Sequence, residues 1–189
     1  MSPDFDYTWV AALAAEIGLV ILLFVVLIYD RFLAPENRRR VALMTAWGGT
    51  IILGVVLALY FFFDLPSAQT SSADALMWGG MIRFDLISFV FEVMFLAALI
   101  VTSLVAIDTP RLQRSEFYAL LSSATLGFIL MAASADLIMV YVALETASIS
   151  SYVLAGFVTD SNRSSEAGMK YFIYGAFATG IMLYGMSLL

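Results

Sequence analysis

The 189-residue sequence contains no cysteine and no histidine, and it contains a single lysine, Lys170. The absence of cysteine and histidine excludes disulfides, thiolate metal sites, imidazole ligation of haem and a histidine pH switch. Any proton or ion chemistry in this chain must therefore use aspartate, glutamate, lysine or arginine. The net charge of -6 also disfavours nucleic-acid binding, which requires a basic surface, so no nucleic-acid partner is expected.

Charged residues are scarce as well, at 13% of the chain against about 25% in a typical soluble domain. Hydrophobic residues make up 62%, and the mean hydropathy is +0.96. A soluble domain of this size could not hide so much apolar surface in one core, so we expect the outer wall of the protein to face lipid. The composition predicts a membrane protein and largely excludes a soluble enzyme.

Six apolar segments are each long enough to cross a bilayer, which requires about 20 helical residues. None shows the charged face of a surface helix, and each exceeds the apolar core of a signal peptide, so no cleaved leader is expected. We predict an all-α bundle of six transmembrane helices that forms one domain over residues 1–189. The predicted spans are residues 9–29, 41–63, 86–107, 117–135, 137–158 and 169–189.

The connections between these spans alternate in charge. Basic residues gather after the first, third and fifth spans, whereas the connection after the second span is acidic. By the positive-inside rule the basic loops are cytoplasmic and the amino terminus lies outside. Seven of the nine cationic residues fit this threading: Arg31, Arg38, Arg39, Arg40, Arg111, Arg114 and Arg163. Ser164 or Ser165, followed by Glu166, is expected to cap the start of the last span.

Carboxyl groups lie inside three of the predicted spans, where an ionised group costs about 2.5–3.5 kcal/mol on insertion scales. Glu16 is in the first span, Glu92 in the third and Glu145 in the fifth. A helix rises about 1.5 Å per residue, so Glu145 lies about 12 Å from the outer end of its span and is predicted to be the deepest of the three. A purely structural bundle would not need these groups, so they are candidates for proton transfer.

The residues around Glu145 strengthen its candidacy. Tyr141, Glu145, Ser148 and Tyr152 share one helical stripe by i, i+4, i+7, i+11 spacing. Their hydroxyls could hold water beside the carboxyl group, as a proton path requires. The alternative is that small hydroxylated residues merely pack helices closely, and that Glu145 is a protonated hydrogen-bond donor.

Lys170 stands at the beginning of the last span, and its position permits two interpretations. It is either a charge that acts on a proton path, or a side chain that snorkels to the cytoplasmic surface. Because Glu145 lies about 20 Å from the cytoplasmic end of its own span, a direct contact between Glu145 and Lys170 is not expected. Water or another helix would have to connect them.

The chain also carries a specific combination of short motifs. They are Glu116-Phe-Tyr-Ala-Leu-Leu, Ala124-Thr-Leu-Gly, Met131-Ala-Ala-Ser-Ala-Asp136-Leu, Leu144-Glu145, Tyr152-Val-Leu-Ala-Gly-Phe157 and Ser165-Glu-Ala-Gly-Met-Lys170-Tyr-Phe. Together with Met81-Ile-Arg-Phe-Asp85 and the arginine-rich link after the first span, these motifs resemble the subunit N family of the bacterial respiratory NADH-quinone oxidoreductase, complex I. The resemblance corresponds to the amino-terminal part of the family, and the last span still continues at Leu189, so we expect a chain truncated at its C-terminus.

The resemblance implies an antiporter-like subunit of the membrane arm, in the bacterial plasma (inner) membrane. In this family, inverted five-helix repeats form proton half-channels that are driven by quinone reduction elsewhere in the complex. The resemblance implies that Glu145 and Lys170 are the family's proton-translocating glutamate and lysine. Glu16 resembles a glutamate often found in the first span of the family, and Glu92 remains an auxiliary candidate with Tyr141, Ser148 and Tyr152.

The chain itself is expected to bind no cofactor or metal. No glycine-rich phosphate loop follows a strand, and no cysteine can ligate an iron-sulfur cluster. The resemblance implies that NADH, FMN, iron-sulfur clusters and quinone belong to partner subunits, and that the partners of this chain are other membrane-arm subunits and lipid. Two alternatives stay open: a subunit of a multisubunit sodium/proton antiporter, and a non-transporting structural subunit whose carboxyl groups only lock helices together.

Overall fold

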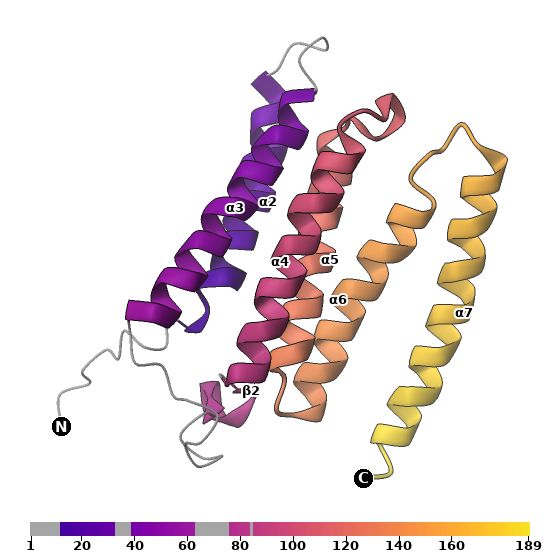
Figure 1. Cartoon of the computed structure of the whole chain (residues 1–189). Helices are drawn as coiled ribbons and strands as arrows, with labels where there is room; N and C mark the ends of the chain where they lie inside the picture. The colour runs from indigo at the N-terminus through magenta and orange to yellow at the C-terminus, as the bar shows by residue number, and fades with distance from the viewer. Residues whose placement is uncertain (1–11, 33–38, 63–75, 84) are drawn as a thin grey trace.

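The computed structural model describes residues 12–32, 39–62, 76–83 and 85–189, and six long helices dominate this part of the chain (Figure 1). Expectations that fall on residues 1–11, 33–38, 63–75 and 84, such as the start of the first predicted span, lie outside the described residues. The helices are α2 (Ala14–Phe32), α3 (Arg39–Phe62), α4 (Leu86–Ala106), α5 (Ser115–Ala133), α6 (Leu137–Ala155) and α7 (Asn162–Met186). The shorter elements are β1 (Leu76–Met77), η2 (Trp78–Gly80), β2 (Ile82–Arg83) and η3 (Pro110–Leu112).

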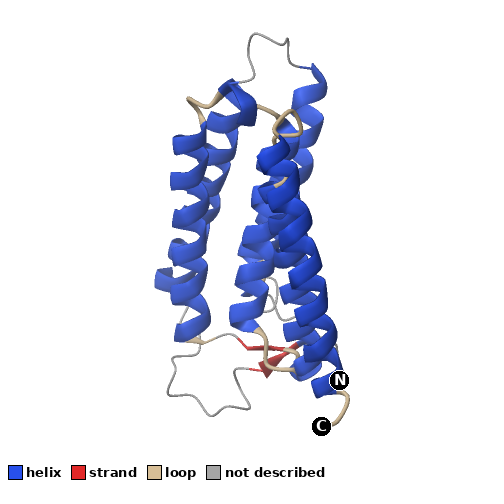
Figure 2. Cartoon of the chain, turned by 90° about the vertical axis from the view of Figure 1, so that its right-hand side faces the viewer, coloured by secondary structure: helices blue, strands red, loops and turns tan. Residues whose placement is uncertain are grey.

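The predicted all-α architecture is confirmed, with one small addition that the sequence did not suggest. Strands β1 and β2 pair as an antiparallel hairpin at one end of the molecule (Figure 2). The turn between them passes through Gly79 at φ 69° and Gly80 at φ 90°, and glycine adopts these values without a steric penalty. The Ala135 amide donates to the Met81 carbonyl over 2.9 Å, so the hairpin is fixed to the turn between α5 and α6.

Each predicted span overlaps one long helix. By length and composition, four of the described helices can cross a membrane: α3, α4, α5 and α6. Helix α2 is 19 residues long but carries Glu16, Asp30 and Arg31, and α7 is 25 residues long but begins with polar turns. The charged residues of α2 and the polar first turns of α7 therefore distinguish these two helices from the other four helices.

Helix α7 differs most from its predicted span. It begins at Asn162, seven residues before the predicted start, because helical structure continues through polar turns that an apolar window does not detect. The predicted cap is also wrong: Ser161 is the N-cap residue and its side chain makes no capping hydrogen bond. The Ser164 hydroxyl instead donates to the Ala155 carbonyl over 3.0 Å and accepts from the Val158 amide over 3.2 Å. Ser164 thus ties α7 to the end of α6.

Helices α2, α3, α4 and α5 form a four-helix bundle, in which each helix packs against two neighbours in the order α2, α3, α4, α5 and back to α2. Helix α6 packs on the outside of α5, and α7 packs chiefly on α6 (Figure 1). In a bilayer, such packing is stabilised by van der Waals contact and hydrogen bonds rather than by exclusion of water. The largest fully buried apolar side chains of the bundle are Tyr118, Leu19, Leu96, Leu99, Ile129, Val26 and Val41.

Helices α5 and α6 approach each other closely at Gly127. A Cβ atom added there would lie 2.5 Å from the Ala147 amide nitrogen and 2.9 Å from the Ala143 carbonyl oxygen. A hydrogen bond between the Ser123 hydroxyl of α5 and the Ser150 hydroxyl of α6, over 3.0 Å, also joins the two helices. Small residues on both helices therefore bring the two backbones together, and α6 is held in a fixed register on the bundle.

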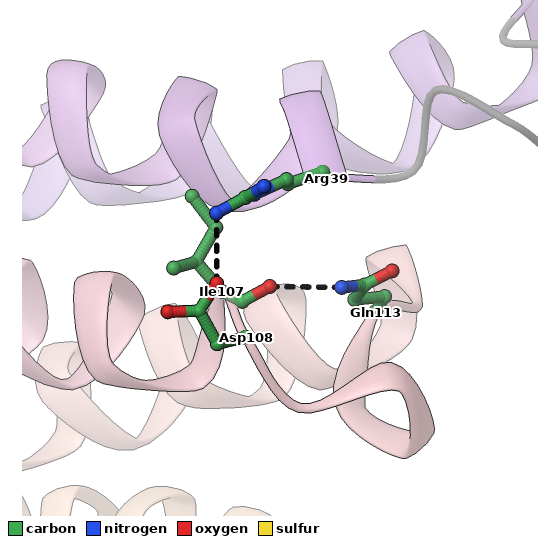
Figure 3. A network of polar contacts seen from close by, with 4 residues as sticks. All are labelled: Arg39, Ile107, Asp108 and Gln113. Carbon is green, nitrogen blue, oxygen red and sulfur yellow. Dashed lines mark hydrogen bonds and ion pairs between the residues drawn. The ribbon is translucent and has the colours of Figure 1, made fainter.

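The helix ends that carry the arginines lie together at one end of the molecule. Arg39 at the start of α3 donates to Asp108 after α4 over 2.7 Å, and the Gln113 amide donates to the Ile107 carbonyl over 2.8 Å (Figure 3). Arg111 in η3 lies 3.9 Å from Asp160 in the α6–α7 connection. These exposed pairs contribute little energy each, but they link three connections at the end predicted to be cytoplasmic. The orientation in a membrane stays a prediction.

Replacing Gly127 by alanine should destabilise the protein, because the new methyl group would collide with the backbone of α6. We expect Gly127→Ala to lower the free energy of unfolding by about 1–3 kcal/mol, measured as a lower thermal midpoint of the purified protein in detergent. The matched control is Gly54→Ala in α3, where an added Cβ meets no atom within 4 Å. That control should be neutral or slightly stabilising. Equal midpoints for the two variants would contradict the proposed α5–α6 contact.

Candidate functional site

The structure divides the predicted site residues between two places. Tyr141, Glu145, Ser148 and Tyr152 all lie on α6, and Lys170 lies on the neighbouring α7. Glu16 and Glu92 instead lie inside the four-helix bundle, on α2 and α4. The sequence spacing gave no indication of this separation, since it depends on which helices become neighbours.

Glycines bring α6 and α7 into contact. A Cβ atom on Gly168 would lie 2.7 Å from the Gly156 Cα, so the two backbones touch where neither residue has a side chain. Further along, a Cβ on Gly175 would lie 2.0 Å from the Tyr152 hydroxyl oxygen. The ring of Tyr152 is buried and makes an edge contact with Tyr171 at 4.8 Å between centroids. Tyr152 therefore fits into a notch on α7 that Gly175 leaves open.

These contacts fix the register of the two antiparallel helices. Gly156 is level with Gly168, so Glu145 is level with a point near Thr179, and Lys170 is level with the last turn of α6. At 1.5 Å per residue, Glu145 and Lys170 are separated by about 14 Å along the helix axes. The separation agrees with the expectation that the two residues make no direct contact.

Glu145 is half-buried, and it makes no hydrogen bond or ion pair with any residue that the structure describes. The predicted depth of Glu145 along its span stays a prediction, and burial inside the protein is a separate quantity: Glu16 and Glu92 are more buried than Glu145, at 7% and 5% exposed. The reason is that distance along a helix does not measure burial: α6 packs on the outside of the bundle, so much of its surface is free of other helices in the described chain.

Some of the hydroxyl groups near Glu145 are already hydrogen-bonded to the backbone, and one is able to bind water. Thr146, Ser150 and Ser151 each donate to the carbonyl oxygen four residues earlier, at 2.7–2.8 Å. Ser148 makes no such bond within the described ranges, so its hydroxyl is available to a water molecule. Since Ser148 is one turn from both Glu145 and Tyr152, it is the residue of this helix best placed to continue a polar path.

Lys170 pairs with Glu166, one turn earlier on α7, and both side chains are more than 60% exposed. The helix begins at Asn162, so the Lys170 Cα lies about 12 Å along α7 rather than at its start. An exposed pair of this kind is worth only about 0–1 kcal/mol. The ammonium group is therefore held weakly and is free to reach other partners.

Glu16 and Glu92 share the interior of the bundle. The Glu16 Oε2 atom is buried without a hydrogen-bond partner in the described chain, and the glycine contacts that α3 makes with α2 and α4 place the two residues at similar levels of the bundle. Sequence reasoning identified both residues but not their proximity. Glutamates on two separate predicted spans give no signal of contact before the helix packing is known.

The structure also contains a pocket that lies apart from Glu145 and Lys170 and apart from the Glu16 and Glu92 pair. This pocket of about 440 Å³ lies between η3 and the α6–α7 connection, and its lining includes Arg111, Arg114 and Asp160 but neither Glu145 nor Lys170. Among the residues that the structure describes, no cluster of three or more metal-binding side chains occurs.

The part of the chain that contains α6 and α7 matches a known family. Residues 134–189 match the sequence model described as "NADH:quinone oxidoreductase/Mrp antiporter, TM". Glu145 and Lys170 both fall within the matched residues.

Curated relatives give a more specific match. NADH-quinone oxidoreductase subunit N of Trichlorobacter lovleyi is 44% identical over 108 residues, which cover 56% of this chain and 22% of that protein. Subunit N 1 of Solibacter usitatus is 55% identical over 75 residues, which cover 40% of this chain and 15% of that protein. The matched segments thus span between about a seventh and a fifth of the length of these relatives.

A solved structure shares the fold over nearly the whole chain. A chain of the respiratory complex I of Thermus thermophilus, determined with bound aureothin, has a TM-score of 0.70 and 27% identity. The match covers 92% of this chain and 36% of that chain. The fold and the matches define a multi-pass membrane protein with an antiporter-like helix arrangement. Within that class, the chain resembles subunit N of NADH-quinone oxidoreductase.

Adding a methyl group at Gly168 should push α7 away from α6, because the new Cβ would meet the Gly156 backbone. Since the chain has no native cysteine, spin labels can be placed on two introduced cysteines at exposed Ile149 and Ile173, and the inter-label distance measured by pulsed electron resonance. We expect a longer or broader distance distribution in Gly168→Ala.

The control for this variant is Gly180→Ala on the same helix, where an added Cβ meets nothing within 4 Å. It should leave the distance distribution unchanged. An unchanged distribution in Gly168→Ala as well would show that the Gly156–Gly168 contact does not set the register.

Proposed function

We propose that this chain acts as a proton-translocating, antiporter-like subunit in the membrane arm of NADH-quinone oxidoreductase, where quinone reduction in other subunits drives proton transfer. One observation carries the proposal: Glu145 and Lys170 lie on α6 and α7, the two helices matched by the antiporter family, and glycine contacts hold these helices in one register. The resemblance to subunit N and the fold shared with a complex I chain support the same function.

In this proposal, Glu145 takes up and releases the proton, and the Lys170 charge modulates how strongly the proton is held. Opposite charges 4 Å apart attract by about 4 kcal/mol at an effective dielectric of 20, whereas at 14 Å the attraction falls to roughly 1 kcal/mol. A movement of the ammonium group toward Glu145 would therefore change the interaction by a few kcal/mol. That amount is comparable with the roughly 2.3 kcal/mol needed to move one charge against 100 mV.

The residues between the two charges are suited to hold water. Tyr152 lies between the levels of Glu145 and Lys170, with its hydroxyl oxygen at Gly175, and Ser148 lies one turn from Glu145. Water bound to these hydroxyls would connect the carboxyl group with the lysine without direct contact. The weak Lys170–Glu166 pair would allow the lysine to change partners.

We further propose that the chain itself carries no redox centre and that NADH, FMN, iron-sulfur clusters and quinone are bound by partner subunits. The absence of cysteine and histidine from the whole sequence supports this division of roles. The partners would be other membrane-arm subunits and lipid, in the bacterial plasma membrane.

A second candidate is a subunit of a multisubunit sodium/proton antiporter, since the description of the matched family also includes Mrp antiporters. Purification of the native assembly from membranes decides between the two. Co-purification with flavin-containing subunits supports the oxidoreductase, whereas a redox-free assembly with sodium-dependent proton exchange supports the antiporter.

Substitution of Glu145 by glutamine should depress proton pumping, because the amide cannot bind and release a proton. In proteoliposomes that contain the whole complex, we expect Glu145→Gln to lower pumping roughly tenfold or more, and Glu145→Asp to restore part of it. The control is Glu116→Gln at the exposed start of α5, which should pump normally. Near-normal pumping in Glu145→Gln would contradict the role of Glu145. A structural role alone predicts that Glu145→Leu keeps both stability and pumping.

Lys170 is either a charge that acts on proton transfer or a side chain that only reaches the surface. Substitutions of Lys170 and of its ion-pair partner Glu166 distinguish these two interpretations. If the lysine charge drives proton transfer, Lys170→Met should lower pumping several-fold, while Lys170→Arg should retain a large part of it. Glu166→Gln should remain close to wild type in stability, because an exposed pair contributes about 0–1 kcal/mol. Normal pumping in Lys170→Met, measured in the same vesicles, would leave Lys170 as a surface side chain only.

A further inference from the structure

The interior of the four-helix bundle contains two carboxyl groups that the proposed function does not use. Helices α2 and α4 lie diagonally across the bundle, since each packs against α3 and α5. The close approaches of Gly18 on α2 to Ile52 on α3, and of Gly49 on α3 to Ile100 on α4, nonetheless place Glu16 and Glu92 within about one helical turn of each other along the helix axes. They are 7% and 5% exposed.

One atom of this pair has no partner. Glu16 Oε2 is buried without a hydrogen bond, although a buried carboxyl oxygen that lacks a donor normally costs several kcal/mol when the group is charged. The Ser88 hydroxyl, one turn before Glu92, has its single hydrogen engaged by Asp85 and the Arg83 carbonyl, which both lie 3.0 Å from Ser88 Oγ, so it is not a free donor. The unpartnered oxygen therefore points to a ligand that brings its own positive charge.

No basic side chain of the described residues forms an ion pair with either carboxyl group. The arginines of the bundle helices, Arg31, Arg39 and Arg40, are exposed at the opposite end, and Arg83 on β2 is exposed as well. Two negative charges enclosed together with no cation are unfavourable both through burial and through mutual repulsion.

The other titratable groups of the surrounding helices and turns do not supply a positive charge to Glu16 or Glu92 either. At the same end of the bundle as the pair are Tyr60 on α3, which stacks on Phe89 of α4 at 4.0 Å, and Asp85, which caps α4. The other titratable groups of the four helices and their adjoining turns are Tyr29, Asp30, Asp108, Arg111, Arg114, Glu116 and Tyr118 near the basic end and Asp136 at the α6 cap. None of them supplies a positive charge to the pair.

We propose that Glu16 and Glu92 form a proton-binding pair, in which the protonated carboxyl group of one residue donates a hydrogen bond to the carboxylate of the other. One proton then satisfies the unpartnered oxygen and removes one of the two charges. Protonation forms one O–H bond at a carboxylate oxygen, and release returns that proton to water. The pair lies nearer the end opposite the basic loops, on the predicted outer side, and it is separate from Glu145 because it lies on α2 and α4 rather than on α6.

The pair is tested by infrared spectroscopy of the whole complex that contains the full chain, recorded in H₂O and D₂O at neutral pH. We expect a protonated-carboxyl C=O band that shifts on deuteration, that changes frequency in Glu16→Gln and in Glu92→Gln, and that is lost in the double variant. Glutamine has the size and neutrality of the protonated acid, so the single variants should keep the thermal midpoint of the wild type.

The matched control is Glu116→Gln, which removes one exposed carboxyl group and should leave the band unchanged. If the double variant keeps the wild-type band, the pair does not hold a proton and the proposal is wrong. If the band appears only when sodium is withdrawn, the site binds a metal cation instead, which also overturns the proposal. Because none of these readouts involves proton pumping, failure of the Glu145 mechanism would not affect them.

Discussion

The structure depends on close backbone contact between helices at positions that carry no side chain or a very small one. In a bilayer, apolar surface gains little by leaving lipid for protein, so helices are held by short-range packing and by hydrogen bonds between them. Gly127 allows α6 to lie directly on α5, and the Gly156–Gly168 contact allows α7 to lie on α6. Without these contacts, α6 and α7 would have no fixed register, and the positions of Glu145 and Lys170 relative to each other would be undefined.

A second constraint is the cost of charge in apolar surroundings, and the chain meets it in two ways. Lys170 is paired with Glu166 on an exposed part of α7, where the pair is weak and can exchange partners. Glu16 and Glu92 are enclosed by the bundle without a basic partner among the described residues. The first arrangement favours a charge that moves, whereas the second favours a bound proton. Both use glutamate and lysine, which belong to the ionisable residue types that remain in a chain without histidine and cysteine.

The sequence predicted the six helices well because long apolar runs and charged connections are local features. It missed the β1–β2 hairpin, whose strands are only two residues each, and the polar first turns of α7. The role of Ser164 was predicted incorrectly because its partners lie at the end of α6, and their proximity depends on the loop conformation. The burial of Glu16 and Glu92 could not be predicted for the same reason, because it depends on helices from elsewhere in the chain.

The central claim is that Glu145 exchanges a proton through water held by its neighbours on α6 and α7. The most direct measurement is an experimental structure of the assembled complex at a resolution that shows ordered water. Our account predicts water molecules that connect the Glu145 carboxyl group with Ser148 and the Tyr152 hydroxyl, and that continue toward the level of Lys170. A Glu145 side chain sealed in dry apolar packing, or directed at lipid chains without polar neighbours, would contradict it.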